Sequence, residues 1–318
     1  MSMVFDAVQV LKNTAKVSDL AEAPTLSDRN QIFLKLETQQ RTKAFKLRGA
    51  YYLMSKLTDE QKKRGVVTCS SGNHAQGVGF AADQFNVKAT IFLPSSTPLT
   101  KIEAVRAYRN ADVRLVKGTF DDALTAALEF QKNTDAIYVP PFDNYNIIAG
   151  QGTVGWEIIN QLPDADIIVV PIGGGGLISG IAFVVKTLKP SCLIYGVQAE
   201  QAAAMFDSRN AGKPVTLDRV STLADGTAVK RPGTITFDLC QKYVDQIVTV
   251  NETQIANAIA RLFRECGVTA EGAGALSVAA VVNGKIPATG KKIVCLISGG
   301  NIDRDNLEKI LKENDSRK

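Results

Sequence analysis

The chain has 318 residues, 45% of them hydrophobic and 22% charged, which is long enough and apolar enough to bury a large core. Its net charge of +5 is spread along the sequence rather than gathered into a run, so nothing indicates a nucleic-acid or membrane surface. This length favours a two-domain enzyme.

Cysteine and histidine usage excludes several kinds of site. The five cysteines are scattered without a C-x-x-C pair, so we expect neither a zinc site nor a disulfide framework. His74 is the only histidine, which rules out a multi-histidine metal centre. The N-terminus lacks a basic segment followed by an apolar core, and we therefore expect a cytoplasmic, reduced protein.

Strand and helix patterns alternate through the first half of the chain. An amphipathic helix and connector over residues 4–20 precede a strand over 32–37 and a helix that opens near Lys46 and runs to Leu57. Further strands are predicted over 66–68, 89–93, 113–116 and 137–139, separated by helices that start after the 69–77 loop, at Lys101 and at Asp121. This alternation indicates a parallel α/β unit with helices on both faces.

Two polar stretches at helix starts are candidates for binding. Lys46 opens a predicted helix, and by itself it is most simply a solvated lysine. In the stretch CSSGNHAQG over 69–77, Ser70, Ser71 and Asn73 either cap the following helix or, with its free N–H groups, hold an anion such as a carboxylate.

The most distinctive stretch is IIVVPIGGGGLISG over residues 167–180. A buried apolar strand runs into Pro171, and a helix begins near Leu177. Between them, glycine leaves the backbone N–H groups uncovered, and the helix N-terminus adds the positive end of its dipole. These features predict a phosphate-binding loop. It consists of Gly173, Gly174, Gly175 and Gly176.

Other interpretations of this stretch compete with binding of a cofactor that has a single phosphate. The segment is uncharged between Asp166 and Lys186, but its glycines and proline make a poor membrane-spanning helix. The dinucleotide-binding spacing G-x-G-x-x-G fails because its last position falls on Ile178 or Ser179, and no Lys-Ser/Thr pair completes a Walker motif. A purely structural glycine turn stays open at this point.

The second half of the chain continues the alternation after a less regular tract. Residues 149–153 are typical of a glycine-rich helix start, and residues 200–229 carry few regular signals. Strands are predicted over 192–198, 246–250 and 293–297, and helices over 252–266, 272–282 and the charged terminus 308–318.

Seven stretches, in this order, resemble the fold-type-II pyridoxal phosphate enzymes over essentially the whole chain. They are TKAFKLRGA (42–50), SSGNHAQG (70–77), AGQGT (149–153), GGGGL (173–177), LADG (223–226), EGAGA (271–275) and SGGN (298–301). Within that group the chain looks most like catabolic threonine/serine dehydratases and serine racemases.

The resemblance implies an α/β fold of two parallel-sheet, three-layer domains of the tryptophan synthase β-like class, with the cofactor between them. The large cofactor-binding domain would combine residues 1–64 and 143–318, and a small mobile domain would span 65–142. Since EGAGA and SGGN lie close to Lys318, we expect no further regulatory domain.

The resemblance also implies how pyridoxal 5'-phosphate would be held. Lys46, next to Phe45, would form the Schiff base with the cofactor and then act as the base on the substrate Cα proton. The loop from Gly173 to Leu177 would bind the phosphate, and Asn73 would hydrogen-bond the ring hydroxyl oxygen.

Ser298 would face the pyridine nitrogen of the cofactor. A carboxylate there would keep that nitrogen protonated and make a deep electron sink, whereas a hydroxyl does not. Deprotonation at Cα is then better coupled to departure of a β-substituent, which favours β-elimination.

The loop over residues 70–74 bears on the choice between dehydratase and racemase. The substrate carboxylate would lie on the loop that contains Ser70, Ser71, Asn73 and His74. Dehydratases of this group commonly carry alanine at the position of Ser71, while racemases carry serine there as the acid–base group opposite the lysine.

The chain departs from the pattern of its relatives at two places. The family pattern reads T-G-S-F-K. This chain has Lys43 and Ala44 at the positions of the glycine and the serine. Racemase-type relatives bind a divalent cation, and Glu200 and the Ala204 carbonyl match two of its ligands, but Phe206 stands where an aspartate would be. A Mg²⁺, Ca²⁺ or K⁺ site on Glu200 and Ala204 is the resulting expectation.

The sequence therefore predicts a pyridoxal-phosphate-dependent L-threonine/L-serine ammonia-lyase that gives a 2-oxo acid and ammonia. The alternatives are a serine racemase with dehydratase side activity and a non-catalytic amino-acid binding protein. We expect a small hydroxy amino acid as substrate, a homodimer or homotetramer, and neither a nucleic-acid nor a membrane partner.

Overall fold

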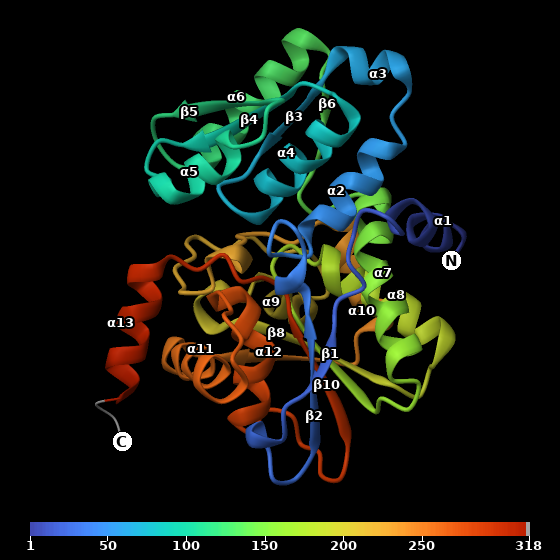
Figure 1. The fold of residues 1–318 in the computed structure, drawn as a ribbon, viewed down its shortest axis with the longest axis vertical. Helices are drawn as coiled ribbons and strands as arrows, with labels where there is room; N and C mark the ends of the chain where they lie inside the picture. The colour runs from blue at the N-terminus through green and yellow to red at the C-terminus, as the bar shows by residue number, and fades with distance from the viewer. Residues whose placement is uncertain (316–318) are drawn as a thin grey trace.

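The computed structural model describes residues 1–315, which form two β-sheets, one above the other in Figure 1. The larger sheet has the strand order β1-β2-β10-β7-β8-β9, in which β1 pairs antiparallel with β2 and the other neighbours pair in parallel. Its strands are β1 Leu20–Glu22, β2 Gln31–Leu36, β7 Ile167–Pro171, β8 Leu193–Ala199, β9 Gln246–Val250 and β10 Lys292–Ile297.

The smaller sheet lies in the upper part of Figure 1 and has the order β5-β4-β3-β6, all parallel. Its strands are β3 Val66–Cys69, β4 Ala89–Pro94, β5 Ala111–Val116 and β6 Ile137–Tyr138. The two central strands, β3 and β4, are buried throughout, as apolar strands of a parallel sheet covered on both faces should be.

Helices cover both faces of each sheet. In chain order they are α1 Ser2–Leu11, α2 Lys46–Ser55, α3 Asp59–Arg64, α4 Asn73–Phe85, α5 Leu99–Arg106, α6 Phe120–Thr134, α7 Tyr145–Gln161, α8 Gly176–Leu188, α9 Ala204–Ala211, α10 Thr234–Tyr243, α11 Glu252–Cys266, α12 Gly272–Val282 and α13 Arg304–Asp315.

The large sheet is the middle of three layers. Alternate residues of β7 point to opposite faces, so Ile167 packs with α11 and α12 while Ile168 packs with α7, α8 and α10. The predicted α/β class with parallel three-layer sheets is confirmed. We call this sheet with its helices the large-sheet unit, and the small sheet with α4, α5 and α6 the small-sheet unit.

Helix α2 joins the two units. Leu53 and Met54 of α2 lie in the same apolar core as Val78 of α4 and Ile91 of β4, and α2 also contacts α7 of the large-sheet unit. The helix that begins at Lys46 is therefore held from both sides. The division of the chain at residues 65 and 142 stays a prediction.

Most predicted elements agree with the structure. Strand β9 and helices α11 and α12 have the predicted bounds, and the other predicted strands of the two sheets agree within two residues where both bounds were given. The predicted terminal helix begins earlier, at Arg304, and its residues 316–318 lie outside the described part of the chain.

Several helix starts differ from the prediction. Helix α4 begins at Asn73, inside the predicted 69–77 loop, and α5 and α6 begin two residues and one residue early. Residues 149–153 lie inside α7, because Asn144 caps this helix by accepting hydrogen bonds from the N–H groups of Asn146 and Ile147. The glycines instead allow close packing: a Cβ on Gly150 would lie 2.7 Å from the Arg48 carbonyl oxygen. Helix α8 begins at Gly176, one residue before the predicted start.

Short elements were not predicted. They are β1, α3, α9 and α10. Strand β1 has three residues and lies at the edge of its sheet, and α9 falls within the irregular tract 200–229. Elements as short as β1, α3 and α9 carry too few periodic positions to be recognised from the sequence, but α10 is as long as the predicted α1 and α2, so length does not explain why it was missed.

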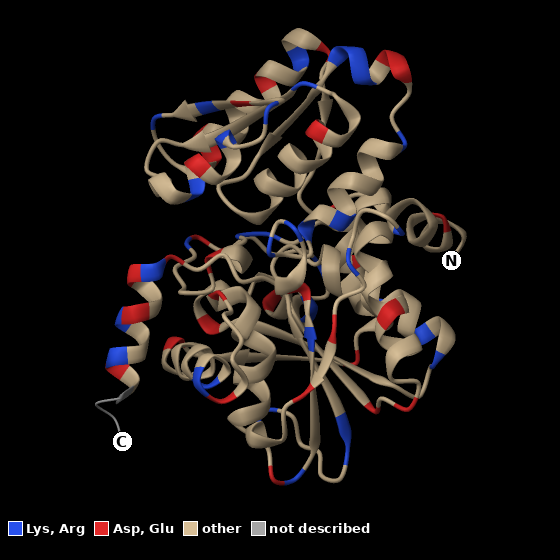
Figure 2. Ribbon diagram, viewed as in Figure 1, with Lys and Arg blue, Asp and Glu red and all other residues tan. Residues whose placement is uncertain are grey.

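Charged residues of both signs are distributed over both units, with blue and red segments alternating along α13 (Figure 2). This arrangement agrees with the absence of a charged run in the sequence. Among residues 1–315, the helices are too short or too polar to cross a membrane.

Candidate active site

The loop before α2 and the loop after β10 are hydrogen-bonded to each other. Phe45 N–H donates to the Ser298 carbonyl at 3.1 Å, and Gly300 N–H donates to the Lys43 carbonyl at 2.9 Å. Strands β2 and β10 are parallel neighbours, so the segments that follow them meet at one edge of the sheet. This contact brings Lys46, next to Phe45, and the buried Ser298 to the same edge of the large sheet.

Lys46 is the first residue of α2, and its Nζ donates a 2.7 Å hydrogen bond to the Pro141 carbonyl. The ring centre of Phe45 lies 5.3 Å from the same nitrogen. Desolvation lowers the pKa of Lys46 to about 8, and the negative charge of Glu271 partly opposes this shift. A lysine with this pKa gives up its proton more readily near neutral pH, as a nucleophilic amine must.

Lys43, one of the two departures from the T-G-S-F-K pattern, has a left-handed backbone with φ of +55°. This region favours glycine, the residue that the pattern has there, because a Cβ crowds the following carbonyl. The chain keeps the backbone shape of the loop at the cost of local strain.

The loop that contains Ser70 and Ser71 leads into α4, whose N-cap is Gly72. No side chain caps this helix, so the capping interpretation of the serines and Asn73 is wrong. Ser70 Oγ instead accepts a hydrogen bond from Gly72 N–H at 3.3 Å. The N-terminal N–H groups of a helix without a side-chain cap suit an anion, and Ser70 and Ser71 lie beside them, half-buried.

His74 is buried and engaged by the backbone. Its Nε2 lies 3.0 Å from the Val139 carbonyl, while its Nδ1 has no hydrogen-bond partner within residues 1–315. Burial lowers the pKa of His74 to about 3, and the nearby Lys46 lowers it further. An imidazole with a pKa this low is a weak base for the Ser71 hydroxyl.

Asn73 belongs to a polar chain that the sequence did not reveal. Its Nδ2 donates to Glu271 Oε1 at 2.5 Å, and its Oδ1 accepts from Asn301 Nδ2 at 2.7 Å. Glu271 was known only as the first residue of EGAGA. No signal in the sequence marks this role, because the burial of the carboxylate at the N-cap position of α12 and its missing cap bond are visible only in the structure.

The glycine loop connects β7 to α8. Gly175 has a φ of +97° and precedes α8, which has no side-chain cap. A Cβ on Gly174 would overlap the Phe142 ring, and one on Gly176 would lie 3.0 Å from Phe142 Cα. The loop is therefore closely packed on one side, and its N–H groups suit a phosphate. The loop begins at Gly173, and the buried Leu177 follows it in α8.

Pro141 and Phe142 connect the glycine loop to the lysine. The carbonyl of Pro141 accepts the hydrogen bond from Lys46, and the next residue, Phe142, packs against Gly174 and Gly176. The candidate phosphate loop and the candidate Schiff-base lysine thus lie on either side of one dipeptide.

The two predicted metal ligands lie close together in the chain. Glu200 is exposed and opens a short 3-10 turn, while the Ala204 carbonyl accepts a 2.5 Å hydrogen bond from the Ser208 hydroxyl. Residues 1–315 contain no cluster of three His, Cys, Asp or Glu side chains arranged for a metal.

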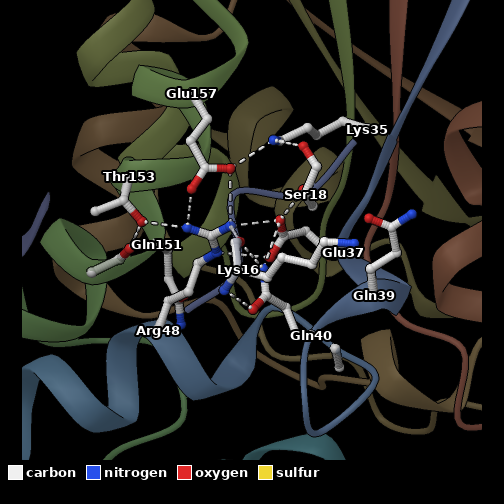
Figure 3. Close-up of polar contacts among 12 residues, drawn as sticks. Lys16, Ser18, Lys35, Glu37, Gln39, Gln40, Arg48, Gln151, Thr153 and Glu157 are labelled. Atoms are coloured by element: carbon white, nitrogen blue, oxygen red, sulfur yellow. Dashed lines mark hydrogen bonds and ion pairs between the residues drawn. The ribbon is translucent and has the colours of Figure 1, made fainter. Parts of the chain in front are cut away.

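A buried ionic network anchors α2 two residues beyond Lys46. Figure 3 shows the Arg48 guanidinium between Glu37 and Glu157. Its Nε lies 2.7 Å from Glu37 Oε2 and its Nη1 lies 2.6 Å from Glu157 Oε1. Lys35 completes the network by donating to Glu157 at 2.6 Å.

These features fit pyridoxal phosphate. A glycine loop with uncovered N–H groups before a helix without a side-chain cap suits the phosphate, a half-buried lysine of lowered pKa suits the aldehyde, and a buried serine suits the pyridine nitrogen. A parallel α/β fold with this lysine at a helix start and this glycine loop defines the class of fold-type-II pyridoxal phosphate enzymes.

Comparison with known proteins agrees with that class. Residues 12–299 match the family described as pyridoxal-phosphate dependent enzyme, and the chain belongs to this family. It is 46% identical over 310 residues to an L-threonine ammonia-lyase of Thermotoga maritima, covering 97% of this chain and 77% of that protein. It is 40% identical over 311 residues to the catabolic L-threonine dehydratase of Escherichia coli, covering 96% and 94%.

Two solved structures share the whole fold. The processed form of threonine deaminase isoform 2 from Solanum lycopersicum has a TM-score of 0.93 at 40% identity, covering 98% of this chain and 87% of that one. Maize serine racemase has a TM-score of 0.93 at 31% identity, covering 99% and 98%. The resemblance stated from the sequence is confirmed.

Proposed function

We propose that the protein is a pyridoxal-phosphate-dependent ammonia-lyase that acts on L-threonine and L-serine. The observation that carries this proposal is Lys46, half-buried, of lowered pKa, and bound next to the glycine loop. The names of relatives that are 40–46% identical over nearly the whole chain support the substrate and the reaction.

The bound cofactor would stabilise negative charge at the substrate Cα. Lys46 would hold the cofactor and move the Cα proton, and the uncapped N-terminus of α4 with Ser70 and Ser71 would orient the substrate carboxylate. Asn73 would hold the ring oxygen, and Ser298, a hydroxyl rather than a carboxylate, would favour departure of the β-hydroxyl. The products would be a 2-oxo acid and ammonia.

Closure of the small-sheet unit over the substrate would exclude water. Contacts between the units support this: Lys101 of α5 forms an ion pair with Asp225, and Lys230 lies 2.9 Å from Asp121 of α6. We place the moving unit at residues 65–142 and the remainder at residues 1–64 and 143–318. Helix α2, which belongs to the remainder, connects the two.

Further properties belong to the same proposal. We expect a homodimer or homotetramer in the cytoplasm, and a Mg²⁺, Ca²⁺ or K⁺ ion on Glu200 and the Ala204 carbonyl. The matching positions in racemase-type relatives are the support for this ion.

Serine racemisation is the second candidate. The hydroxyl of Ser71, at a position where dehydratases commonly carry alanine, favours it, as does the fold shared with maize serine racemase. The lowered pKa of His74 argues for elimination as the main activity, because it makes the imidazole a weak base for Ser71.

A direct assay separates these activities. The protein loaded with pyridoxal phosphate should turn L-threonine into 2-oxobutanoate and ammonia, and L-serine in deuterated water should give pyruvate faster than D-serine. If D-serine forms faster and Ser71→Ala removes only that product, the racemase assignment replaces ours. Borohydride reduction should attach the cofactor to Lys46, and a protein that stays colourless with the cofactor would be a binding protein.

A further inference from the structure

Glu271 lies where three elements of the site converge. It directly precedes α12, its backbone N–H donates to the Gly299 carbonyl at 3.1 Å, and its side chain reaches Asn73 at the start of α4. A Cβ on Gly299 would overlap Glu271 Oε1 and lie 3.0 Å from Asn73 Nδ2. The absence of a side chain at residue 299 therefore makes room for the carboxyl–amide contact.

Asn301 fixes the orientation of the Asn73 amide. The two N–H groups of Asn301 are used, one toward the Thr42 carbonyl at 2.8 Å and one toward Asn73 Oδ1 at 2.7 Å. The oxygen of Asn73 is thereby engaged, so its NH₂ group must face Glu271. One N–H goes to the carboxyl, and the second is left for another acceptor.

The η4 turn (Asp225–Thr227) lies beside the Glu271 carboxyl, because a Cβ on Gly226 would be 3.6 Å from Glu271 Oε1. Asp225 of this turn adds a negative charge, Lys101 of α5 pairs with Asp225, and Lys46 of α2 is close enough for its charge to interact with that of Glu271. His74 of α4 is neutral. Burial, followed by the charge of Asp225, raises the pKa of Glu271 to about 7, while Lys101 lowers it.

We propose that Glu271 is a positioning residue that acts through Asn73 on the ring oxygen of the bound cofactor, and that the Lys101–Asp225 pair between the two units controls its proton. The proposal rests on the proposed function, because that function places the ring oxygen at the second N–H of Asn73. Ionised Glu271 puts a negative charge two hydrogen bonds from that oxygen, through the Asn73 amide, and protonation removes this charge.

The consequence is a link between closure and the electronics of the cofactor. When Lys101 meets Asp225, the positive charge offsets that of Asp225 and favours ionised Glu271. When the units separate, Asp225 acts on Glu271 without this offset, and Glu271 holds its proton to higher pH. The charge beside the ring oxygen thus follows the position of the small-sheet unit.

The visible absorbance of the bound cofactor tests this proposal in the holoenzyme without substrate. The wild-type spectrum should change with pH around a midpoint near 7, and E271Q, which keeps an oxygen for the Asn73 hydrogen bond, should lose this change. Asp225→Asn should move the midpoint to lower pH and Lys101→Met to higher pH, each by about half a pH unit or more.

The opposite directions of these shifts make the test specific. Asp112→Asn, which removes a carboxylate that pairs with Arg114 within the small-sheet unit, is the control and should leave the midpoint unchanged. A midpoint that survives in E271Q, or that moves the same way in Asp225→Asn and Lys101→Met, would overturn the proposal. If E271Q does not fold, the two other variants still decide the matter.

Failure of the proposed function would look different. A protein whose Lys46 is not labelled by borohydride, or that does not act on L-threonine or L-serine, would contradict the proposed function. A working lyase with an unchanged spectral midpoint would contradict only the role of Glu271.

Discussion

At the residue scale, Lys46 combines a helix start, partial burial and a backbone acceptor. The Pro141 carbonyl can accept from either the ammonium or the amine, so it holds the side chain in place without an acidic partner that would keep it charged. Desolvation then decides the pKa.

The stability of the cofactor-free protein should report this pKa. Because the pKa of Lys46 is about 8 in the folded state and 10.5 as a model value, the folded protein binds fewer protons between these values. The free energy of unfolding should therefore rise with pH across this window, by up to about 3 kcal/mol from this group. The free energy of unfolding in urea is measured at each pH for the wild type and for Lys46→Met, and the difference between them isolates the contribution of Lys46. A difference that does not change with pH would contradict the prediction.

Replacing the strained Lys43 should stabilise the protein. Lys43→Gly removes the crowding at φ +55° but adds freedom to the unfolded chain, so we expect a net gain of roughly 0.5–1 kcal/mol in the free energy of unfolding. Lys43→Asn, which tolerates this region better than lysine does, should fall between the two in thermal unfolding. A loss of stability in Lys43→Gly would mean that the lysine side chain makes a contact that outweighs the strain.

At the element scale, the glycine loop before α8 lacks side chains for two reasons. Its packing against Phe142 leaves no room for a Cβ, and phosphate binding needs uncovered N–H groups. Gly174→Asp should weaken pyridoxal phosphate binding, because the carboxylate repels the phosphate and its Cβ overlaps the Phe142 ring. Gly174→Ala brings the overlap without the charge and is the matched control. Titration with pyridoxal, which lacks the phosphate, should show a smaller difference between these variants.

The ionic network around Arg48 should be needed for stability. Arg48→Met leaves the buried carboxylates of Glu37 and Glu157 without their main partner, which should cost about 3–5 kcal/mol. Arg304→Met, at an exposed pair with Glu308, should change stability by less than about 1 kcal/mol. Equal losses in urea unfolding of the two variants would show that the network is not what anchors α2.

At the scale of the whole molecule, pairs such as Lys230 with Asp121 join the two units through exposed side chains. Asp121→Asn should change the free energy of unfolding by at most about 1 kcal/mol. It should nevertheless reduce the dependence of KM for L-threonine on salt concentration, because salt screens a contact that favours closure. Asp112→Asn, within one unit, should keep the wild-type dependence, and identical behaviour of both variants would argue against closure through this pair.

Features that depend on residues close together in the sequence could be predicted, and features that depend on residues far apart could not. Strands such as β9 and helices such as α11 carry their period in their own residues, so their bounds were predictable. Lys46 and the glycine loop stood in recognisable motifs. Glu271 did not reveal its role, because its contact to Asn73 joins residues far apart in the chain and exists only once three elements have come together.

The place of β10 in the sheet has a consequence for synthesis of the protein. This strand lies between β2 and β7, yet a ribosome makes it after both of them. The small-sheet unit has all its strands within residues 66–138 and can form while the chain is still being translated. The loop of Lys46 meets its partners Ser298 and Gly300 only after β10 and the segment that follows it have been translated, so the nascent chain cannot complete its cofactor site earlier.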